Sequence, residues 1–155
     1  MQHFLKYWLP ILLWLGMIFV GSTDLMSAEH TSRFIGPFLQ WLKPDISPAM
    51  LASIHFFVRK SAHLGEYAVL ALLMFRAVTS MTHLKWPVLI LSVGIWIACL
   101  FVAATDEFHQ TLVQSRGASV ADVMVDSGGA VLGLFIGARL RMCRLAKLKS
   151  TSARL

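Results

Sequence analysis

The sequence predicts an all-α protein, a polytopic membrane bundle of four transmembrane helices with an interfacial amphipathic segment between the first and the second. Of the 155 residues, 57% are hydrophobic and 14% are charged, whereas about a quarter of the residues in a soluble domain are charged. The apolar residues gather in four stretches, each close to the ~20 residues that a helix needs to cross ~30 Å of hydrocarbon. This length has room for one bundle, so residues 1–155 are predicted to form a single transmembrane domain. We place its spans at about residues 4–22, 62–79, 87–105 and 120–138.

The charged residues predict how these spans are oriented. On one side of the membrane lie the N-terminus, the loop 76–86 and the tail 139–155, which contain Lys and Arg but no Asp or Glu. An excess of Lys and Arg in short loops marks the cytoplasmic side, so both termini are predicted to be cytoplasmic. All the acidic residues then fall on the extracytoplasmic side, or just inside the bilayer from it: Asp24, Glu29, Asp45, Glu66, Asp106, Glu107, Asp122 and Asp126.

The basic tail, residues 139–155, carries six of the fourteen Lys and Arg residues. A net charge of +6 would also suit a nucleic-acid-binding protein. Here a stop-transfer role and attraction to anionic headgroups, worth ~1 kcal/mol per charge near the surface, account for the pattern. We therefore expect the lipid bilayer as a partner and no nucleic acid. The sequence leaves the oligomeric state open.

The first span begins with a feature that secretory signals share, because Lys6 stands ahead of its apolar run. The run is long, however, and the residues after it lack a convincing small-x-small cleavage pattern. We therefore expect the first span to be retained.

The longest connection, residues 23–60, contains two short apolar segments at 34–42 and 50–58. They are too short to span the membrane, and the dipeptides Lys43-Pro44 and Ser47-Pro48 predict turns between them. We expect both segments to lie in the outer interface as short amphipathic helices, with aromatic residues at headgroup depth. They would act as an interfacial anchor or, alternatively, as a lid over a site below.

The second span opens with a polar motif, Arg59-Lys60-x-x-His63-x-x-Glu66-Tyr67. A spacing of three residues places His63 and Glu66 on one helical face. At ~1.5 Å rise per residue, Glu66 lies several ångströms inside the hydrocarbon. A carboxylate at that depth has to face protein or trapped water, and it needs a partner or a proton.

Two further polar motifs lie at the outer ends of the third and fourth spans. The third span ends in Asp106-Glu107-x-x-Gln110, and Arg116-Gly117 precedes Asp122 and Asp126 on the fourth. Asp122 and Asp126 are four residues apart, so both project from the same helical face. That face continues as a small-xxx-small track that lets another helix approach closely, formed by Gly129, Gly133 and Gly137.

These three motifs, in this order and at these intervals, resemble the VanZ-like family of small bacterial membrane proteins. That family is associated with low-level resistance to glycopeptide antibiotics such as teicoplanin. The resemblance implies a polytopic protein of the bacterial plasma (inner) membrane. It also implies functional roles for these residues: Arg59, Lys60, His63, Glu66, Tyr67, Asp106, Glu107, Gln110, Arg116, Asp122 and Gly129. One departure is Asp126, where the family commonly has Asn; an ionised Asp126 would favour a bound cation or a cationic partner.

Two interpretations of the polar cluster compete with a binding role. The first is a buried ion-pair network that holds the helices in register, since a lone charge in hydrocarbon costs at least ~2.5 kcal/mol. The second is a membrane-embedded enzyme acting on a lipid-linked phosphate, with His63 or Glu66 as the general base. A divalent metal is not strongly indicated; its candidate ligands are His63, Glu66, Asp106 and Glu107.

The interpretation that the sequence favours is a site that binds or remodels an anionic cell-envelope lipid, a peptidoglycan precursor or a glycopeptide. Arg offers a planar fork that suits phosphate oxygens, and a binding site requires no nucleophile, of which the sequence offers no convincing example. The ligand-binding residues would be Arg59, Lys60, Tyr67, Asp106, Glu107, Gln110, Arg116, Asp122 and Asp126.

Overall fold

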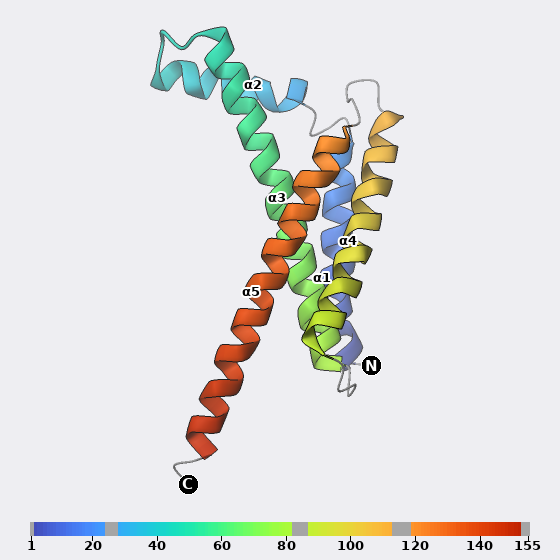
Figure 1. Ribbon diagram of the computed structural model, residues 1–155. Helices are drawn as coiled ribbons and strands as arrows, with labels where there is room; N and C mark the ends of the chain where they lie inside the picture. Colours follow the sequence, from blue (N-terminus) through green and yellow to red (C-terminus); the bar gives the residue numbers. More distant parts are fainter. Residues whose placement is uncertain (1, 24–27, 82–86, 113–118, 153–155) are drawn as a thin grey trace.

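The protein is built from helices that run the length of a narrow bundle (Figure 1). The computed structural model describes residues 2–23, 28–81, 87–112 and 119–152, and no strand occurs within these ranges. Every described helix except the second is long and apolar enough to cross a membrane, which confirms the predicted class. In chain order the helices are α1 (Gln2–Ser22), α2 (Ala28–Leu42), α3 (Pro48–Met81), α4 (Val88–Thr111) and α5 (Val120–Ser152).

The four long helices alternate in direction along the bundle. Figure 1 shows α1 and α4 side by side, both running away from the end that holds the N-terminus, while α3 and α5 run back and cross each other. We call the end where α1 and α4 finish and α5 begins the polar end. The described residues of all three predicted polar motifs therefore lie at one end of the bundle, as alternating spans require.

The second long helix differs from the prediction, because α3 begins at Pro48 and runs unbroken to Met81. The segment 50–58 is therefore part of α3 and not a separate interfacial helix. Ser47 caps the helix, since its Oγ accepts a hydrogen bond from the Met50 N–H at 3.2 Å, and proline is favourable at the first helical position. Arg59 and Lys60 interrupt the apolar run of this segment, but the helix continues through both residues.

The predicted amphipathic segment is present as α2, which begins at Ala28 and ends at Leu42. Its exposed apolar side chains include Phe38, Trp41 and Leu42. A turn at residues 43–47 joins it to α3, in agreement with the two X-Pro signals. Figure 1 shows α2 together with the start of α3 projecting from the polar end of the bundle.

The basic tail is not a separate element, because α5 continues through it to Ser152. Its 33 residues make a helix ~50 Å long at ~1.5 Å per residue, which exceeds the hydrocarbon thickness. In Figure 1 this last part of α5 extends beyond the other helices at the end opposite the polar one.

The closest helix pair is α3 with α5, and glycines make that approach possible. A Cβ added at Gly129 would collide with the carbonyl oxygen of Leu64, and one added at Gly133 would collide with the carbonyl oxygen of Ala68. A Cβ at Gly137 would lie 2.8 Å from Cδ1 of Phe75. The two backbones thus touch at two positions about one helical turn apart, which fixes the register of the polar residues above them.

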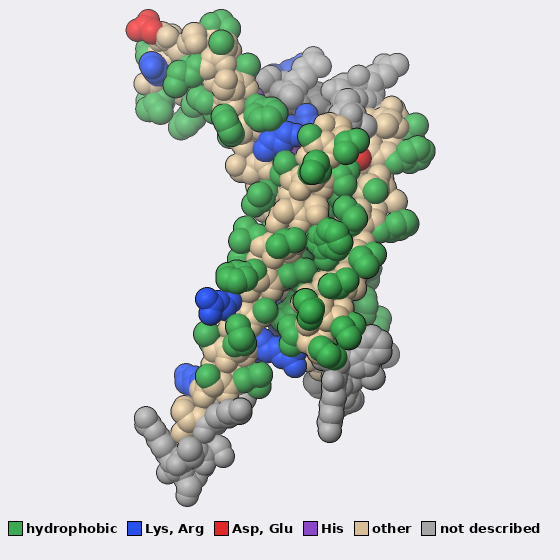
Figure 2. Space-filling view, in the orientation of Figure 1, with side chains coloured by type: hydrophobic (Ala, Val, Ile, Leu, Met, Phe, Trp, Pro, Cys, Tyr) green, Lys and Arg blue, Asp and Glu red, His purple; other side chains and the backbone are tan. Residues whose placement is uncertain are grey.

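The outer surface of the bundle is apolar. Figure 2 shows hydrophobic side chains covering the visible waist of the molecule, with Lys and Arg near its two ends. Large side chains such as Leu13, Leu89 and Phe101 are more than half exposed. Such a surface suits contact with lipid chains and not with water, so the protein is a multi-pass membrane protein.

Candidate functional site

The polar end buries a set of side chains that would be costly to bury without partners. Within the described part of the chain, the buried polar and charged residues are Ser22, His63, Asp106, Glu107, Gln110, Asp122 and Asp126. Five of these were predicted ligand-binding residues and His63 was one of the two candidate bases, whereas no sequence pattern pointed to Ser22. They come from all four long helices, so the polar end is one site shared by the whole bundle.

The outermost layer of the site, which we call the rim, consists of Arg59, Lys60 and Asp122. Asp122 is 3% exposed, and its Oδ2 lies 3.4 Å from Nη2 of Arg59. Its Oδ1 forms a second ion pair with Nζ of Lys60. The two cationic side chains keep 34% and 20% of their surface exposed. One carboxylate therefore contacts two cations, and Glu107 and Asp126 also act on Lys60 electrostatically.

One helical turn further in, His63 of α3 faces Asp126 of α5. The His63 Nδ1 atom lies 3.2 Å from Oδ1 of Asp126, and Asp126 has no exposed surface. The predicted catalytic pair was His63 with Glu66, but the nearest acidic partner of His63 is Asp126. Glu66 still acts on His63 electrostatically.

Tyr67 lies below this pair and is fully buried. Its hydroxyl has no hydrogen-bond partner among the described residues. The carboxylates of Asp106, Asp126 and Glu66 are close enough to act on it electrostatically. We call Glu66, Tyr67, Asp106, Gln110 and Asp126 the inner layer of the site.

On the other side of the inner layer, Asp106 joins α1 to α4. The hydroxyl of Ser22 donates a hydrogen bond to Oδ1 of Asp106, and Nε2 of Gln110 donates one to Oδ2 at 3.0 Å. Both Asp106 oxygens therefore have neutral donors. Gln110 is fully buried, and its Oε1 has no partner among the described residues.

Glu107 ties α4 to the beginning of α5. Its Oε2 accepts a hydrogen bond from the backbone N–H of Ser119 at 2.8 Å, and Ser119 in turn caps α5 through the N–H of Ala121 at 3.2 Å. A carboxylate at a helix N-terminus also interacts favourably with the helix dipole. One oxygen of Glu107 thus has a structural role.

Glu66 faces α1, where it lies beside two residues that sequence reasoning missed. A Cβ added at Gly21 would lie 3.8 Å from Oε1 of Glu66, an ordinary van der Waals contact. Trp14 donates its indole N–H to the Glu66 carbonyl oxygen at 2.8 Å. No sequence pattern would have selected Gly21 or Trp14 as a neighbour of Glu66.

Two further predictions about the site concern Arg116 and a metal ion. Arg116 lies outside the described residues, so its placement stays a prediction. The metal candidates His63, Glu66, Asp106 and Glu107 are distributed among different contacts, and the described side chains include no group of three His, Cys, Asp or Glu arranged to hold a metal ion. The sequence spacing placed these residues at one end but could not fix which helix each one faces.

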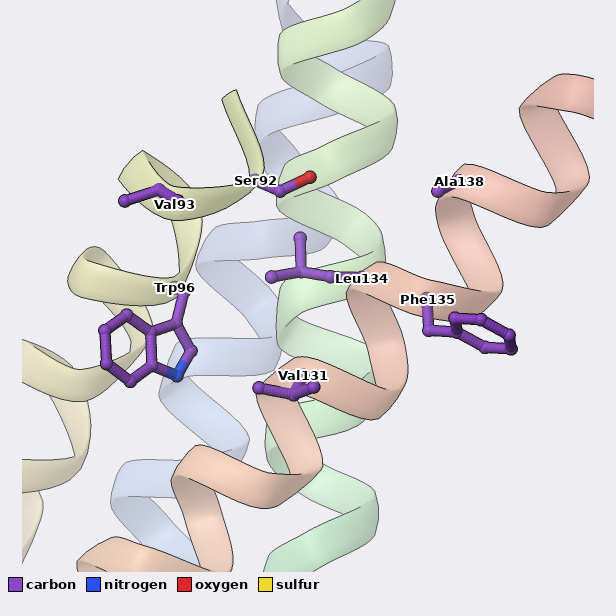
Figure 3. Close-up of a pocket in the computed structure, with 7 residues that line it drawn as sticks. All are labelled: Ser92, Val93, Trp96, Val131, Leu134, Phe135 and Ala138. Atoms are coloured by element: carbon purple, nitrogen blue, oxygen red, sulfur yellow. The ribbon is translucent and has the colours of Figure 1, made fainter. Parts of the chain in front are cut away.

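An apolar concave feature lies between α4 and α5, away from the polar motifs (Figure 3). Its walls are apolar, with Trp96 on one side and Val131 and Leu134 on the other. Trp96 donates its indole N–H to Oγ of Ser127 at 3.0 Å, which joins α4 to α5. The groove is open along its length and offers no charged side chain, so it resembles a lipid-facing surface more than a polar ligand site.

Comparison with protein families gives a match over most of the chain. The family model described as VanZ/LLP1 matches residues 7–141, a range that includes all the predicted motifs, the whole of α3 and α4, and most of α1 and α5. No curated protein and no solved structure gives a significant match.

Proposed function

The chain belongs to the VanZ/LLP1 family, and from the geometry of its polar end we propose that it binds the phosphate-bearing headgroup of a cell-envelope lipid at the rim. In this proposal the protein resides in the bacterial plasma membrane with both termini in the cytoplasm and the polar end outside. The distribution of Lys and Arg between the loops supports this orientation.

The observation that carries the proposal is the pair of partly exposed cations at the rim. Both Arg59 and Lys60 contact Asp122, and they keep 34% and 20% of their side-chain surface exposed. The Arg59 Nε atom is buried and has no hydrogen-bond partner among the described residues. A guanidinium with a spare donor next to an ammonium is a favourable place for phosphate oxygens, which accept charge-assisted hydrogen bonds.

The surroundings of the rim suit a ligand that arrives from the membrane. Phe56 and Phe57, just ahead of Arg59 on α3, are more than half exposed, as are Phe38 and Trp41 on α2. Exposed aromatic residues next to basic ones are typical of the membrane–water interface. A lipid phosphate at that depth would lie beside the rim without leaving the bilayer.

Several ligands share this chemistry. They include anionic phospholipids and lipid-linked peptidoglycan precursors, whose phosphate or diphosphate would occupy the rim. A glycopeptide antibiotic is another candidate for the same end of the bundle. We propose that a contribution to teicoplanin resistance, which the family resemblance suggests, follows from binding at this site.

The test is a binding series on the purified full-length protein in detergent, with phosphatidylglycerol and undecaprenyl diphosphate as probes. The variants are Arg59→Gln and Lys60→Gln, and the matched control is Arg144→Gln, an exposed arginine on the basic part of α5. A hydrogen bond to a charged group contributes about 1.5–3 kcal/mol, so each rim variant should weaken binding about tenfold or more.

The control variant Arg144→Gln should weaken binding only as much as the loss of one positive charge anywhere on the surface would. Equal thermal stability of the three variants has to be verified first. If rim and control variants lose affinity to the same extent, binding is general attraction to basic residues and the proposal is wrong. If the wild-type protein binds phosphatidylglycerol but not undecaprenyl diphosphate, the ligand class narrows to phospholipids.

A second candidate function is catalysis, which the buried His63–Asp126 pair favours. A carboxylate next to a histidine can orient the ring and stabilise its protonated form, as a general base requires. Under this alternative, His63→Gln abolishes release of phosphate from a lipid diphosphate while leaving lipid binding measurable. Absence of any turnover by the wild-type protein would reject it.

A further inference from the structure

The end of the bundle opposite the polar end has basic side chains and no acidic ones, and we call it the basic end. The chain segments that form it contain no Asp or Glu in residues 1–23, 67–105 and 127–155. Arg76 near the end of α3 and Arg139 and Arg141 on the last part of α5 belong to it, and Figure 2 shows Lys and Arg on this part of the surface. Because the chain supplies no acidic side chain here, a negatively charged partner has to come from outside it.

The apolar groove between α4 and α5 leads toward the basic end. Its lining runs from Trp96 and Val131 to Ser92 and Ala138 (Figure 3). Since α4 begins at the basic end and α5 runs toward it, Ser92 and Ala138 are the lining residues nearest to that end. Arg139 directly follows Ala138. An apolar surface and a cluster of positive charge are therefore continuous.

Two arginines are placed at the end of this groove. A long side chain on a helix covers the turn that precedes its own Cα, and Arg139 does so, with Cζ 5.5 Å from the ring centroid of Phe135, a lining residue. Arg141 follows Leu134 by seven residues, about two helical turns, so it lies on the face that lines the groove. Its Nη1 atom is buried and has no hydrogen-bond partner among the described residues. The protein thus leaves a donor of this guanidinium unsatisfied.

We propose that the groove binds an acyl chain of an anionic phospholipid whose phosphate contacts Arg139 and Arg141. This site is separate from the rim and does not depend on the proposed function, because the two lie at opposite ends of the bundle. The lipid would belong to the leaflet that the positive-inside rule assigns to the cytoplasm. Basic pockets between transmembrane helices on that side are typical binding sites for anionic headgroups.

The size of the groove favours an acyl chain over a helix of a second copy. Its volume is about 370 Å³, and an apolar cavity of about 150 Å³ already holds a benzene ring. One turn of a helix, about 10 Å wide and ~5.4 Å long, occupies roughly 400 Å³, so a helix does not fit inside the groove. A second copy packed here in the same orientation would also bring its own basic end against this one, where like charges repel.

The test counts bound lipids by native mass spectrometry of the purified full-length protein in detergent. The probes are phosphatidylglycerol, which has a net negative charge, and phosphatidylcholine with the same acyl chains, which has none. The measurements are made on Arg59→Gln protein, in which the rim contributes little binding, and are repeated on the wild type. Phosphatidylglycerol is expected to bind about tenfold or more tightly, the factor for one hydrogen bond to a charged group.

The headgroup contacts are tested by Arg139→Gln and Arg141→Gln. Each is expected to lower the ratio of phosphatidylglycerol to phosphatidylcholine affinity about fivefold or more. The control is Arg144→Gln, an exposed arginine further along the same helix, which should keep the ratio. If Arg141→Gln unfolds at a lower temperature without lipid, Arg139→Gln decides, because Arg139 is exposed.

The acyl-chain contact is tested by filling the groove from α4. Val93 lines the groove and is 47% exposed, so Val93→Trp places a large side chain in the space of the acyl chain and should lower the affinity for both lipids. Its matched control is Ile90→Trp, at a half-exposed position of the same helix that does not line the groove. Ile90→Trp should lower neither affinity.

Four outcomes would overturn the inference. Equal affinities for the two lipids, or an equal loss in Arg144→Gln, would mean that basic residues attract lipid without a specific site. Weaker binding in the arginine variants with none in Val93→Trp would remove the acyl chain from the groove. A dimer that Val93→Trp dissociates and Ile90→Trp does not would make the groove an interface between copies. Failure of the rim proposal has a different signature, since wild type and Arg59→Gln would then bind the same number of lipids.

Discussion

His63 and Asp126 form a buried pair at the point where α3 meets α5, with Nδ1 3.2 Å from Oδ1. The pair lies next to the place where Gly129 meets the Leu64 carbonyl. Since the helices are in backbone contact there, the pair has no room to separate. The polar site and the helix crossing are therefore one structural unit, and changes in either should affect the other.

Replacing His63 should destabilise the protein more than replacing Asp126. In His63→Leu the Asp126 carboxylate stays buried without its cationic neighbour, and breaking a buried pair in this way costs about 3–5 kcal/mol. In Asp126→Leu the imidazole can lose its proton, so the loss should be smaller. The double variant should regain part of the stability, with a coupling free energy of about 0.5–3 kcal/mol.

This cycle is measured by thermal or denaturant unfolding of the four proteins in detergent. Additive effects of the two single changes would mean that the two side chains contribute independently. If His63→Leu and Asp126→Leu lower the free energy of unfolding equally, then loss of a proton by the imidazole does not reduce the cost of removing its partner, and the argument is wrong.

Two adjacent glycines on α5 should respond in opposite ways to the same substitution. In Gly129→Ala the new Cβ meets the Leu64 carbonyl, whereas at Gly128 it meets nothing within 4 Å. Overpacking of this kind costs about 1–3 kcal/mol. Alanine is favoured over glycine in a helix by about 1 kcal/mol, so Gly128→Ala should be neutral or slightly stabilising.

The measurement is the midpoint of thermal unfolding in one detergent, with wild type and both variants compared side by side. A midpoint for Gly129→Ala at or above that of Gly128→Ala would show that α3 and α5 do not approach as closely as described.

Much of the fold could be predicted from the sequence because hydropathy and charge report directly on burial in a membrane. The presence of four long apolar helices and the shared end of the polar motifs followed from these patterns. The helix ends did not all follow, since α4 continues to Thr111 and α5 to Ser152, beyond the predicted 105 and 138. The start of α3 did not, because Arg59 and Lys60 interrupt the apolar run although nothing interrupts the helix between Pro48 and Met81. Hydropathy marks where a helix enters lipid, and caps and prolines mark where it begins.

The contacts within the site were less predictable, and His63 shows why. A three-residue spacing places His63 and Glu66 on neighbouring positions of one face, but their directions differ by ~60° in a helix of 3.6 residues per turn. That difference is enough for His63 to face Asp126 on α5 while Glu66 lies beside Gly21 on α1. Which helix covers each part of a face depends on the packing of the whole bundle.

Removing the Glu107 carboxylate should loosen the start of α5. Glu107→Ala deletes the hydrogen bond to the Ser119 N–H and a negative charge near a helix N-terminus, together about 1–3 kcal/mol. Glu107→Gln keeps an acceptor and should lose less. Hydrogen exchange by mass spectrometry should show faster exchange in the first turn of α5 for Glu107→Ala, with no change in α1. Uniformly faster exchange in all helices would indicate global destabilisation instead.

The two native cysteines provide a test of orientation, because Cys143 is exposed and Cys99 is buried. Cys143 lies on the basic part of α5, which the positive-inside rule assigns to the cytoplasm. A membrane-impermeant maleimide should therefore label the wild-type protein in inside-out vesicles and not in spheroplasts, and Cys143→Ser should abolish the signal. Asp45→Cys in the Cys143→Ser protein, in the turn between α2 and α3, should be labelled only in spheroplasts. The reversed pattern would place the rim at the inner leaflet, and the ligand would then have to be a lipid of the cytoplasmic face.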